Sequence, residues 1–283
     1  MLISEALELA TDKFSDAGVL SPSVDAELLG CFILEATRSE LTMLAISGES
    51  FPENKLSDFL EVVRRREKRE PLQHITGLAP FRHLELEVGP GVFIPRPETE
   101  QLVDLAMQKI EALQNPVIVD LCSGSGAISI ALNTEVAGST VYSVELSKEA
   151  FSFLTRNYQR YGLDPKALRN ENLTTALEDL AAGVDLVVSN PPYIPDAAVP
   201  IDLEVKLHDP ALALYGGEDG LDVIRQISAR AWYLLRPGGH LVLEHAHTQA
   251  PAIGELLLNQ GWQDVVSASD LTGKDRMISA VRP

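Results

Sequence analysis

The chain has 283 residues, 45% of them hydrophobic, which can bury a sizeable core and allows one large domain plus a small one. Its formal net charge of -18, from 41 acidic and 23 basic residues, argues against a protein that grips a nucleic-acid backbone, because such binding normally needs clustered Lys and Arg. No window reaches the length of a membrane span, and two cysteines without a disulfide framework, Cys31 and Cys122, indicate a reducing, cytoplasmic location.

Residues 1–75 are expected to form a small helical bundle. Apolar residues recur at helical spacing over residues 2–10, 24–32 and 56–63. The first of these stretches carries two glutamates and lacks the basic start of a secretory leader, so it is predicted to be an amphipathic helix and not a signal peptide.

A basic run, Arg64-Arg65-Arg66-Glu67-Lys68-Arg69, closes the last of these helices. The favoured interpretation is favourable charge at a helix C-terminus on a solvated face. Contact with a partner macromolecule is the alternative.

Residues 76–98 are predicted to be a linker with a β-hairpin. The pattern changes at Phe81 from helical spacing to alternation, which continues to Val88. Gly89-Pro90-Gly91 then breaks the alternation and is the expected turn.

Residues 99–283 alternate between strand and helix patterns, which predicts an α/β fold with a mostly parallel, doubly wound sheet. Three of the apolar strands run up to Asp120, Glu145 and Asn190. In such sheets ligands bind beyond the carboxyl ends of the strands, so these side chains are expected to meet at one edge.

A glycine-rich stretch, Leu121-Cys122-Ser123-Gly124-Ser125-Gly126, joins the first of these strands to a helical pattern at residues 127–132. The glycines allow close approach of a ligand, and the helix start offers free N–H groups. A dinucleotide fingerprint would need a third glycine where the chain has Ser129. Glu145 could accept hydrogen bonds from both hydroxyls of a ribose, so Asp120, the glycine stretch and Glu145 predict an adenosine-type cofactor site.

The tetrapeptide Asn190-Pro191-Pro192-Tyr193 follows a buried strand pattern at residues 184–189. The prolines fix φ and provide carbonyl acceptors without competing N–H groups, which suits an NH2 group of a substrate. The Tyr193 ring offers a face for a planar group. Together these features indicate a site for methylating a planar amide or an exocyclic amine.

With these motifs in place, the chain resembles the class I S-adenosylmethionine-dependent methyltransferases, and within them the HemK/PrmC family, the N5-glutamine methyltransferases of peptide chain release factors. The resemblance covers nearly the whole length. It includes further runs at residues 69–77, 93–100, 216–221, 243–245 and 270–276. The string Ile94-Pro95-Arg96-Pro97-Glu98-Thr99-Glu100 is the most specific, because Asn-Pro-Pro-Tyr also occurs in enzymes that methylate adenine N6.

The resemblance implies S-adenosyl-L-methionine as cofactor, the glutamine of the Gly-Gly-Gln motif of release factors as methyl acceptor, and an N-terminal domain that helps to grip this partner. Asn190 and Pro191 would accept the two N–H bonds of the glutamine amide, with Tyr193 packed on the amide plane. Two positions depart from the family pattern. Cys122 stands where glycine is usual. The chain has Glu171-Asn172-Leu173-Thr174 in the stretch where the family has an acidic residue followed by an aromatic one near the adenine, and here Leu173 is expected to cover an adenine face and Asn172 to bond its amino group.

Other polar residues have simpler interpretations. His245 and His247 would share one face of a predicted strand, but no third ligand lies at useful spacing, so no metal is expected. The resemblance places His74 and Arg96 near the domain junction, where each could hydrogen-bond the linker. Arg276 is predicted to be a structural salt-bridge partner.

Two other functions stay open. An adenine-N6 methyltransferase acting on DNA or RNA would share Asn190–Tyr193 but would need a basic groove, and the sequence offers only residues 64–69. A non-catalytic adapter that binds an adenosine ligand or a translation factor would be favoured if Cys122 and Leu173 spoiled the cofactor pocket.

Overall fold

The computed structural model describes residues 1–200 and 202–283. Its backbone divides into two compact units, Met1–Leu78 with Pro200–His208, and Ala79–Val199 with Asp209–Pro283. Among the described helices, none is long and apolar enough to cross a membrane.

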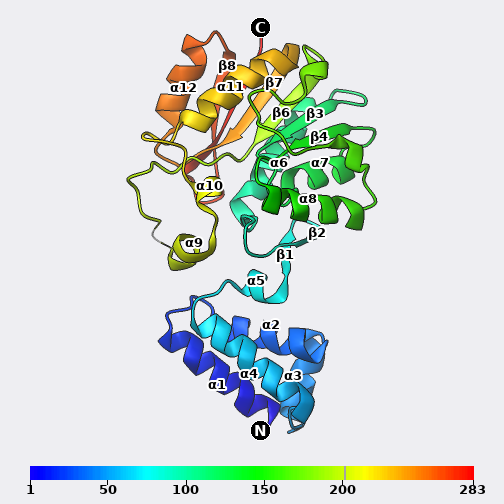
Figure 1. Cartoon of the computed structure of the whole chain (residues 1–283), viewed down its shortest axis with the longest axis vertical. Helices are drawn as coiled ribbons and strands as arrows, with labels where there is room; N and C mark the ends of the chain where they lie inside the picture. The colour runs from blue at the N-terminus through cyan, green and yellow to red at the C-terminus, as the bar shows by residue number, and fades with distance from the viewer. Residues whose placement is uncertain (201) are drawn as a thin grey trace. The chain divides into compact units, whose positions relative to one another are not determined.

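The first unit is helical (Figure 1). Its helices are α1 (Ile3–Asp16), α2 (Pro22–Leu34), α3 (Arg38–Ile46), α4 (Glu53–Glu67), α5 (Leu72–Thr76) and α9 (Leu203–His208). The helix starts follow from sequence, since Pro22 opens α2 and Thr37 caps α3 by accepting a bond from the Glu40 N–H. Apolar side chains at helical spacing, among them Phe14, Leu29 and Phe59, form the unit's own core.

Most arginines of the basic run at the end of α4 form ion pairs within the first unit. Arg66 is buried and lies 2.7 Å from Asp25 of α2, and both Arg66 and Arg69 pair with Glu204 of α9. Arg65 pairs with Glu70 at 2.6 Å. The expectation of a solvated face is therefore wrong for Arg66, because this guanidinium neutralises acids inside the unit.

The second unit contains a seven-stranded sheet of order β5-β4-β3-β6-β7-β9-β8. The strands are β3 (Val117–Leu121), β4 (Thr140–Val144), β5 (Leu168–Arg169), β6 (Val184–Ser189), β7 (Leu235–Glu244), β8 (Gln263–Ser269) and β9 (Asp275–Val281). From β5 to β7 neighbouring strands are parallel, and β9 pairs antiparallel with both β7 and β8. The predicted α/β fold with a mostly parallel, doubly wound sheet is confirmed.

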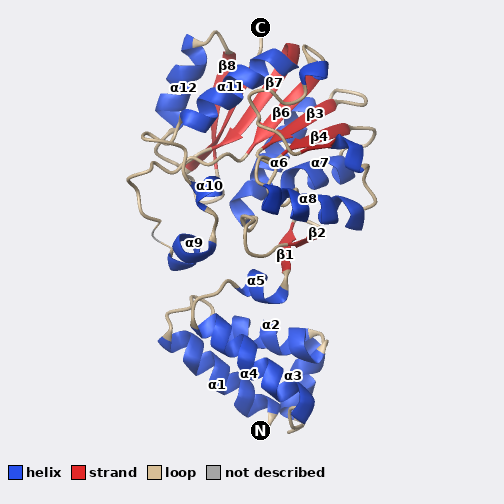
Figure 2. Ribbon diagram, in the orientation of Figure 1, coloured by secondary structure: helices blue, strands red, loops and turns tan. Residues whose placement is uncertain are grey.

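Helices cover both faces of this sheet (Figure 2). They are α6 (Pro97–Ile110), α7 (Ala127–Glu135), α8 (Lys148–Arg160), α11 (Asp222–Leu234) and α12 (Ala250–Asn259). The connections between these elements contain the short helix α10 (Ala211–Leu214) and 3-10 turns at Pro165–Ala167 and Glu178–Leu180. Successive strand residues point to opposite faces, so Ile118 packs with α6, α7 and α8 while Val119 packs with α11 and α12. Burial on both faces explains why the strands read as continuous apolar runs.

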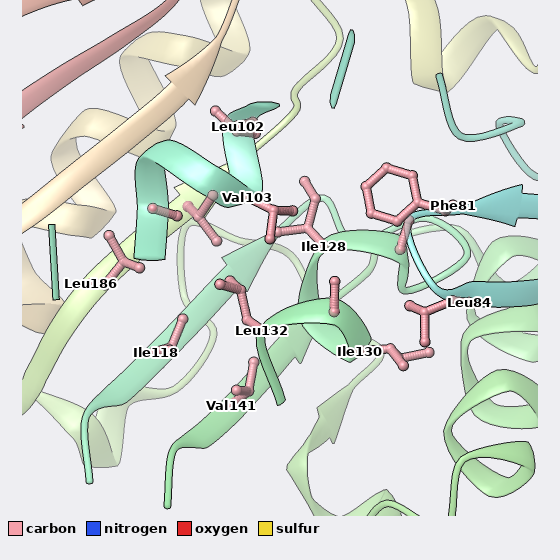
Figure 3. Packing of buried hydrophobic residues seen from close by; sticks show 14 of the residues in the cluster. Phe81, Leu84, Leu102, Val103, Ile118, Ile128, Ile130, Leu132, Val141 and Leu186 are labelled. Carbon is pink, nitrogen blue, oxygen red and sulfur yellow. The ribbon is translucent and has the colours of Figure 1, made fainter. Parts of the chain in front are cut away.

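A two-stranded sheet, β1 (Leu78–Phe81) and β2 (Leu84–Glu87), precedes α6. Its turn is Arg82-His83 and not the expected Gly89-Pro90-Gly91. The earlier turn lets Phe81 and Leu84, on either side of it, both enter the core formed by α6, α7 and the sheet (Figure 3). Gly89 instead gives room to the ring of Phe153, since a Cβ there would lie 3.0 Å from it.

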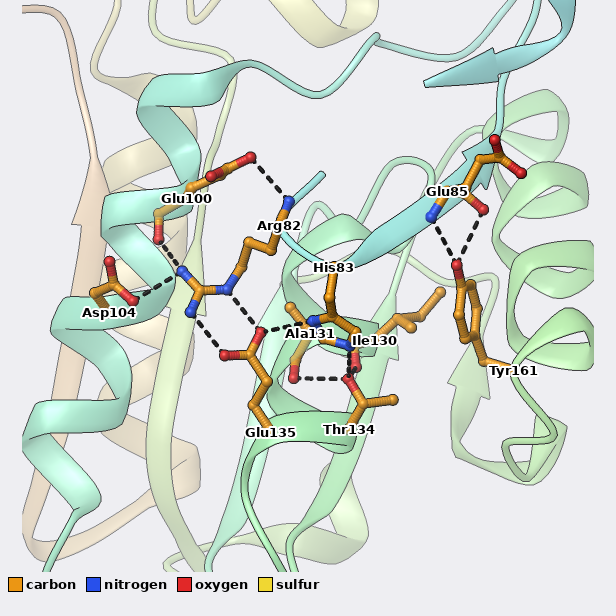
Figure 4. Close-up of polar contacts among 10 residues, drawn as sticks. All are labelled: Arg82, His83, Glu85, Glu100, Asp104, Ile130, Ala131, Thr134, Glu135 and Tyr161. Atoms are coloured by element: carbon orange, nitrogen blue, oxygen red, sulfur yellow. Dashed lines mark hydrogen bonds and ion pairs between the residues drawn. The ribbon is translucent and has the colours of Figure 1, made fainter. Parts of the chain in front are cut away.

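Arg82 fastens this turn to two helices (Figure 4). Its guanidinium pairs with Glu135 of α7 at 2.6 Å and with Asp104 of α6 at 2.8 Å, and its backbone N–H donates to the Glu100 side chain. The Glu135 carboxylate raises the pKa of Arg82 further above its ordinary value. The helix that follows the glycine stretch and the helix that begins at Pro97 are thereby held together at one point.

Candidate active site

The glycine turn, defined here as Leu121–Gly126, takes the chain from β3 into α7. Cys122, Gly124 and Gly126 all have left-handed backbone conformations, with φ of 64°, 56° and 90°. At Gly126 the left-handed conformation disfavours other residues, and a Cβ there would lie 2.7 Å from the end of the Leu154 side chain, which would have to shift. At Gly124 an added Cβ would meet nothing within 4 Å, so the turn has open space on that side.

Glu145 follows β4 and binds the glycine turn directly. Its Oε2 accepts a 2.8 Å hydrogen bond from the Gly124 N–H, and its Oε1 accepts one of 2.7 Å from the Ser147 N–H. Asn170 holds the backbone in place by donating to the carbonyls of Glu145 and Leu146. Burial raises the pKa of the Glu145 carboxyl, and the backbone N–H groups offset part of this increase.

Asp120 is fully buried, and within the described chain neither of its carboxyl oxygens has a hydrogen bond of standard geometry. Burial raises its pKa to about 7, although the nearby hydroxyls of Ser123 and Ser129 oppose the shift and Glu145 adds to it. A fully buried carboxyl group with only weak hydroxyl and backbone partners, next to the glycine turn, is a candidate for a functional site.

The end of β6 lies against the glycine turn. The Ser189 hydroxyl donates a 2.5 Å bond to the Leu121 carbonyl, and Ser189 also interacts with the Cys122 thiol. Burial raises the pKa of that thiol, so Cys122 is a neutral group beside the turn. As expected, the fold brings the carboxyl ends of β3, β4 and β6 to one edge of the sheet.

The NPPY segment, defined as Asn190–Tyr193, begins directly after β6. Asn190 Nδ2 donates a 3.1 Å bond to Thr99 Oγ1 of α6, whereas its Oδ1 accepts no hydrogen bond from the described residues. The Tyr193 carbonyl accepts a 2.9 Å bond from Gln249, and a Cβ at Gly220 would lie 2.3 Å from it. Between them the Pro191 carbonyl has no donor in the described part of the chain.

Tyr193 and Glu244 form the far side of this region. The Tyr193 hydroxyl makes a long, 3.5 Å contact with Glu244 at the end of β7. Burial raises the Tyr193 pKa above its ordinary value and raises that of Glu244 to about 7. Arg276 lies near both groups and forms a salt bridge with Asp270, so its predicted structural role is confirmed. Arg96 likewise pairs with Asp209, at 2.7 Å.

The structure bears differently on the two residues expected near an adenine. Leu173 is half-buried against the α11 side of the core. Asn172 is exposed, and its Oδ1 accepts bonds from the Thr174 N–H and hydroxyl. These two bonds compete with an adenine amino group for the same Asn172 oxygen. The assignment of Asn172 and Leu173 to the adenine stays a prediction.

The expected shared face of His245 and His247 is wrong, because β7 ends at Glu244 and the chain turns there. His245 is buried with Nδ1 2.9 Å from the Ala246 carbonyl, and His247 is exposed. His74, in the first unit, packs edge-on at 6.4 Å from His208. Over the described ranges no cluster of three or more His, Cys, Asp or Glu side chains could hold a metal ion.

Sequence reasoning missed three residues of this region, namely Thr99, Asn170 and Glu244. Thr99 lies in the first turn of α6, far from Asn190 in sequence. Thr99 and Glu244 lie within the runs at residues 93–100 and 243–245 that carry the family resemblance, and Glu244 is also a further acid at the end of an apolar strand.

The sheet order, the glycine turn, the strand-end acids and the NPPY segment together define a class I methyltransferase. Residues 5–77 match the family described as PrmC N-terminal domain, and residues 84–214 match the methyltransferase small domain. A 16S rRNA N2 methyltransferase of T. thermophilus shares the fold, with a TM-score of 0.51, 20% identity, and coverage of 73% of this chain and 50% of that one.

Full-length relatives are more specific. The release factor glutamine methyltransferase of Streptomyces coelicolor is 46% identical over 287 residues, covering 99% of this chain and 98% of the relative. That of Bifidobacterium longum is 40% identical, with 99% and 100% covered. The chain belongs to the family of release factor glutamine methyltransferases, and the resemblance to the HemK/PrmC family is confirmed.

Proposed function

We propose that this protein transfers a methyl group from S-adenosyl-L-methionine to the side-chain amide nitrogen, N5, of the glutamine in the Gly-Gly-Gln motif of peptide chain release factors. The observation that carries the proposal is the state of the Asn190 amide. Its nitrogen is anchored to Thr99, its oxygen has no donor among the described residues, and it stands at the strand end beside the glycine turn. This arrangement suits an acceptor NH2 group.

The residues present fit the cofactor. Glu145 uses one lone pair of each oxygen for backbone N–H groups, which leaves capacity for two ribose hydroxyls. Gly124 leaves room for close approach, and a cationic ligand nearby would favour the ionised form of the buried Asp120 carboxyl group. The cofactor would lie along the glycine turn, next to Cys122, Ser123, Ser125 and Gly126. Its adenine would lie against Asn172 and Leu173, and its methyl group would lie next to Asn190. When bound, the cofactor supplies an electrophilic methyl group.

The chemical difficulty is that a carboxamide nitrogen is a poor nucleophile, because its lone pair is delocalised into the carbonyl. Asn190 Oδ1 and the Pro191 carbonyl would accept the two N–H bonds of the glutamine amide and stabilise the positive charge that grows on nitrogen during attack. They would also hold the nitrogen in line with the methyl group, while Pro192 fixes the backbone and Tyr193 packs on the amide plane. The extra proton leaves after transfer, so no strong base is needed.

The partner in this proposal is a release factor, and the helical residues 1–75 help to recognise it. In this proposal residues 76–98 are the linker with the hairpin and residues 99–283 the catalytic domain, apart from Pro200–His208, which belong to the helical unit. Such a substrate belongs to the cytoplasm, where two free cysteines are stable.

An adenine-N6 methyltransferase is the second candidate, since Asn-Pro-Pro-Tyr would also accept an exocyclic amine. It requires a basic surface for phosphates, and the basic run of α4 is occupied by Asp25, Glu70 and Glu204. A binding adapter without chemistry is the third, and it predicts either no cofactor binding or binding without transfer.

The test is methyl transfer from labelled S-adenosylmethionine to three acceptors, namely a purified release factor, the same factor with its Gly-Gly-Gln glutamine replaced, and duplex DNA. We expect label on the intact factor alone. Label on DNA would favour the adenine function. Cofactor binding without label on any acceptor would favour the adapter.

A further inference from the structure

Thr99 accepts a hydrogen bond from the amide of Asn190 and lies close enough to the carboxylate of Glu244 to lower its pKa. Asn190 Nδ2 donates to Thr99 Oγ1 at 3.1 Å, and the Thr99 hydroxyl interacts with Glu244 without reaching standard hydrogen-bond geometry. Thr99 and Glu244 are both 4% exposed, so bulk water cannot readily replace either contact.

The hydrogen-bond capacities of these groups are complementary. A hydroxyl has one proton to donate, and in the described chain no group accepts the Thr99 proton at standard geometry. Among the described residues, Glu244 Oε2 is a buried acceptor to which no group donates, and Oε1 has only the long contact from the Tyr193 hydroxyl. The unmatched donor and the unmatched acceptor are neighbours, which is how buried polar groups are normally satisfied.

We propose that Thr99 and Glu244 are positioning residues that fix the orientation of the Asn190 amide. The Thr99 hydroxyl donates its one hydrogen bond to the Glu244 carboxylate, so Thr99 Oγ1 can only accept from Asn190. Asn190 must then turn its nitrogen toward Thr99 and its oxygen toward the substrate. A reversed amide would present N–H groups to the N–H groups of a glutamine and would lose the acceptor. This inference rests on the proposed function, because it assigns supports to the same substrate cradle.

The protonation state of Glu244 decides which group donates and which accepts in the hydrogen bonds from Glu244 through Thr99 to Asn190. A protonated Glu244 could donate to Thr99, and Thr99 could then donate to the Asn190 oxygen. The charged or titratable groups that face Glu244 are Tyr193 after β6, Arg276 on β9 and Glu98 on α6. Burial raises the pKa of Glu244 to about 7 in their presence, so turnover at saturating substrate should rise as the pH passes through about 7.

The experiment measures kcat, KM and cofactor Kd with the full chain and a purified release factor. Thr99→Ser keeps the hydroxyl, and its kcat should stay within about threefold of the parent value. Thr99→Val keeps the shape of the side chain but removes the hydroxyl, so its kcat should fall by about tenfold to a hundredfold while its cofactor Kd is unchanged. Glu244→Gln keeps the shape without the charge, so its pH profile should lose the rise near 7.

Equal kcat for Thr99→Val and the parent would overturn the inference, as would equal losses in Thr99→Ser and Thr99→Val, which indicate packing alone. If Thr99→Val does not fold, the Glu244→Gln profile decides, and an unchanged rise near pH 7 would overturn the inference. A parent protein that binds cofactor but does not label the release factor would overturn the proposed function and this inference with it.

Discussion

The backbone N–H of Gly124 donates a 2.8 Å hydrogen bond to Glu145 Oε2, so the acid that follows β4 also fixes the turn that follows β3. The register of these strands, with Leu121 opposite Val144, brings the two groups together. A single carboxylate thereby shapes the glycine turn and keeps lone pairs for a ligand.

Replacement of Glu145 by alanine should therefore weaken S-adenosylmethionine binding by about tenfold to a hundredfold, because it removes a charge-assisted acceptor and loosens the turn. Isothermal titration calorimetry measures the effect. Glu255→Ala, which removes an exposed acid on α12, is the matched control and should bind normally. Equal affinity of Glu145→Ala and the parent would remove Glu145 from the cofactor site.

Asn190→Ala should abolish methyl transfer while it spares most cofactor affinity, because Asn190 is assigned chiefly to the acceptor amide. We expect a loss of at least about a hundredfold in kcat/KM, the size typical of a missing oxyanion-type partner. Radiolabel transfer and calorimetry separate the two effects. Asn259→Ala, at an exposed helix end, is the control, and parental turnover in Asn190→Ala would show that the cradle is wrongly assigned.

The two positive-φ glycines of the turn should respond differently to alanine. Gly124→Ala meets no protein atom within 4 Å and should cost about 1 kcal/mol of backbone strain. Gly126→Ala should cost more, because it adds to the same strain a Cβ that lies 2.7 Å from the buried Leu154 side chain and forces it to shift.

Gly124→Ala should nevertheless lower cofactor affinity, because its Cβ points into the open space of the turn. Gly48→Ala, with φ of 75° and no atom within 4 Å of its added Cβ, isolates the strain alone. Chemical denaturation and calorimetry test the set, and unchanged cofactor binding by Gly124→Ala would show that the space is not used.

Arg82→Ala should lower the free energy of unfolding by about 1–3 kcal/mol. The substitution leaves the partly buried Glu135 carboxylate without its main cationic partner and removes the ion pairs that hold the β1–β2 turn to α6 and α7. Urea unfolding followed by circular dichroism gives the value. Arg64→Ala removes an exposed pair with Glu61 and should change stability by less than about 0.5 kcal/mol. Similar losses in both variants would argue against the role of Arg82.

Asp120 should make the ligand-free protein less stable as pH rises. Its folded pKa, about 7, lies above the ordinary carboxyl value, so its contribution is fully present below that ordinary value and is lost as the pH rises through about 7. Asp120→Asn should flatten the dependence of Tm on pH between about 5 and 8. A slope identical to that of the parent would show that Asp120 is not the titrating group.

The sequence by itself determined the class of fold, because each strand and helix carries its own period, and it placed Asp120, Glu145 and Asn190 at strand ends, where a parallel sheet must gather them. Local pattern also placed Pro22 at the start of a helix. Strand periods, helix periods and helix starts depend on residues that are close together in the chain, so they can be predicted from the sequence alone.

Only the tertiary structure decided which distant groups meet. Thr99 and Asn190 are 91 positions apart, and their contact depends on how α6 packs beside β6. The hairpin turned at Arg82 because Phe81 and Leu84 both gain burial in a core built by later elements, and this outweighed the turn preference of Gly89-Pro90-Gly91. Likewise Arg66 entered the interior because Asp25 and Glu204 neutralise it there. Burial and long-range pairing, unlike periodicity, are properties of the assembled chain.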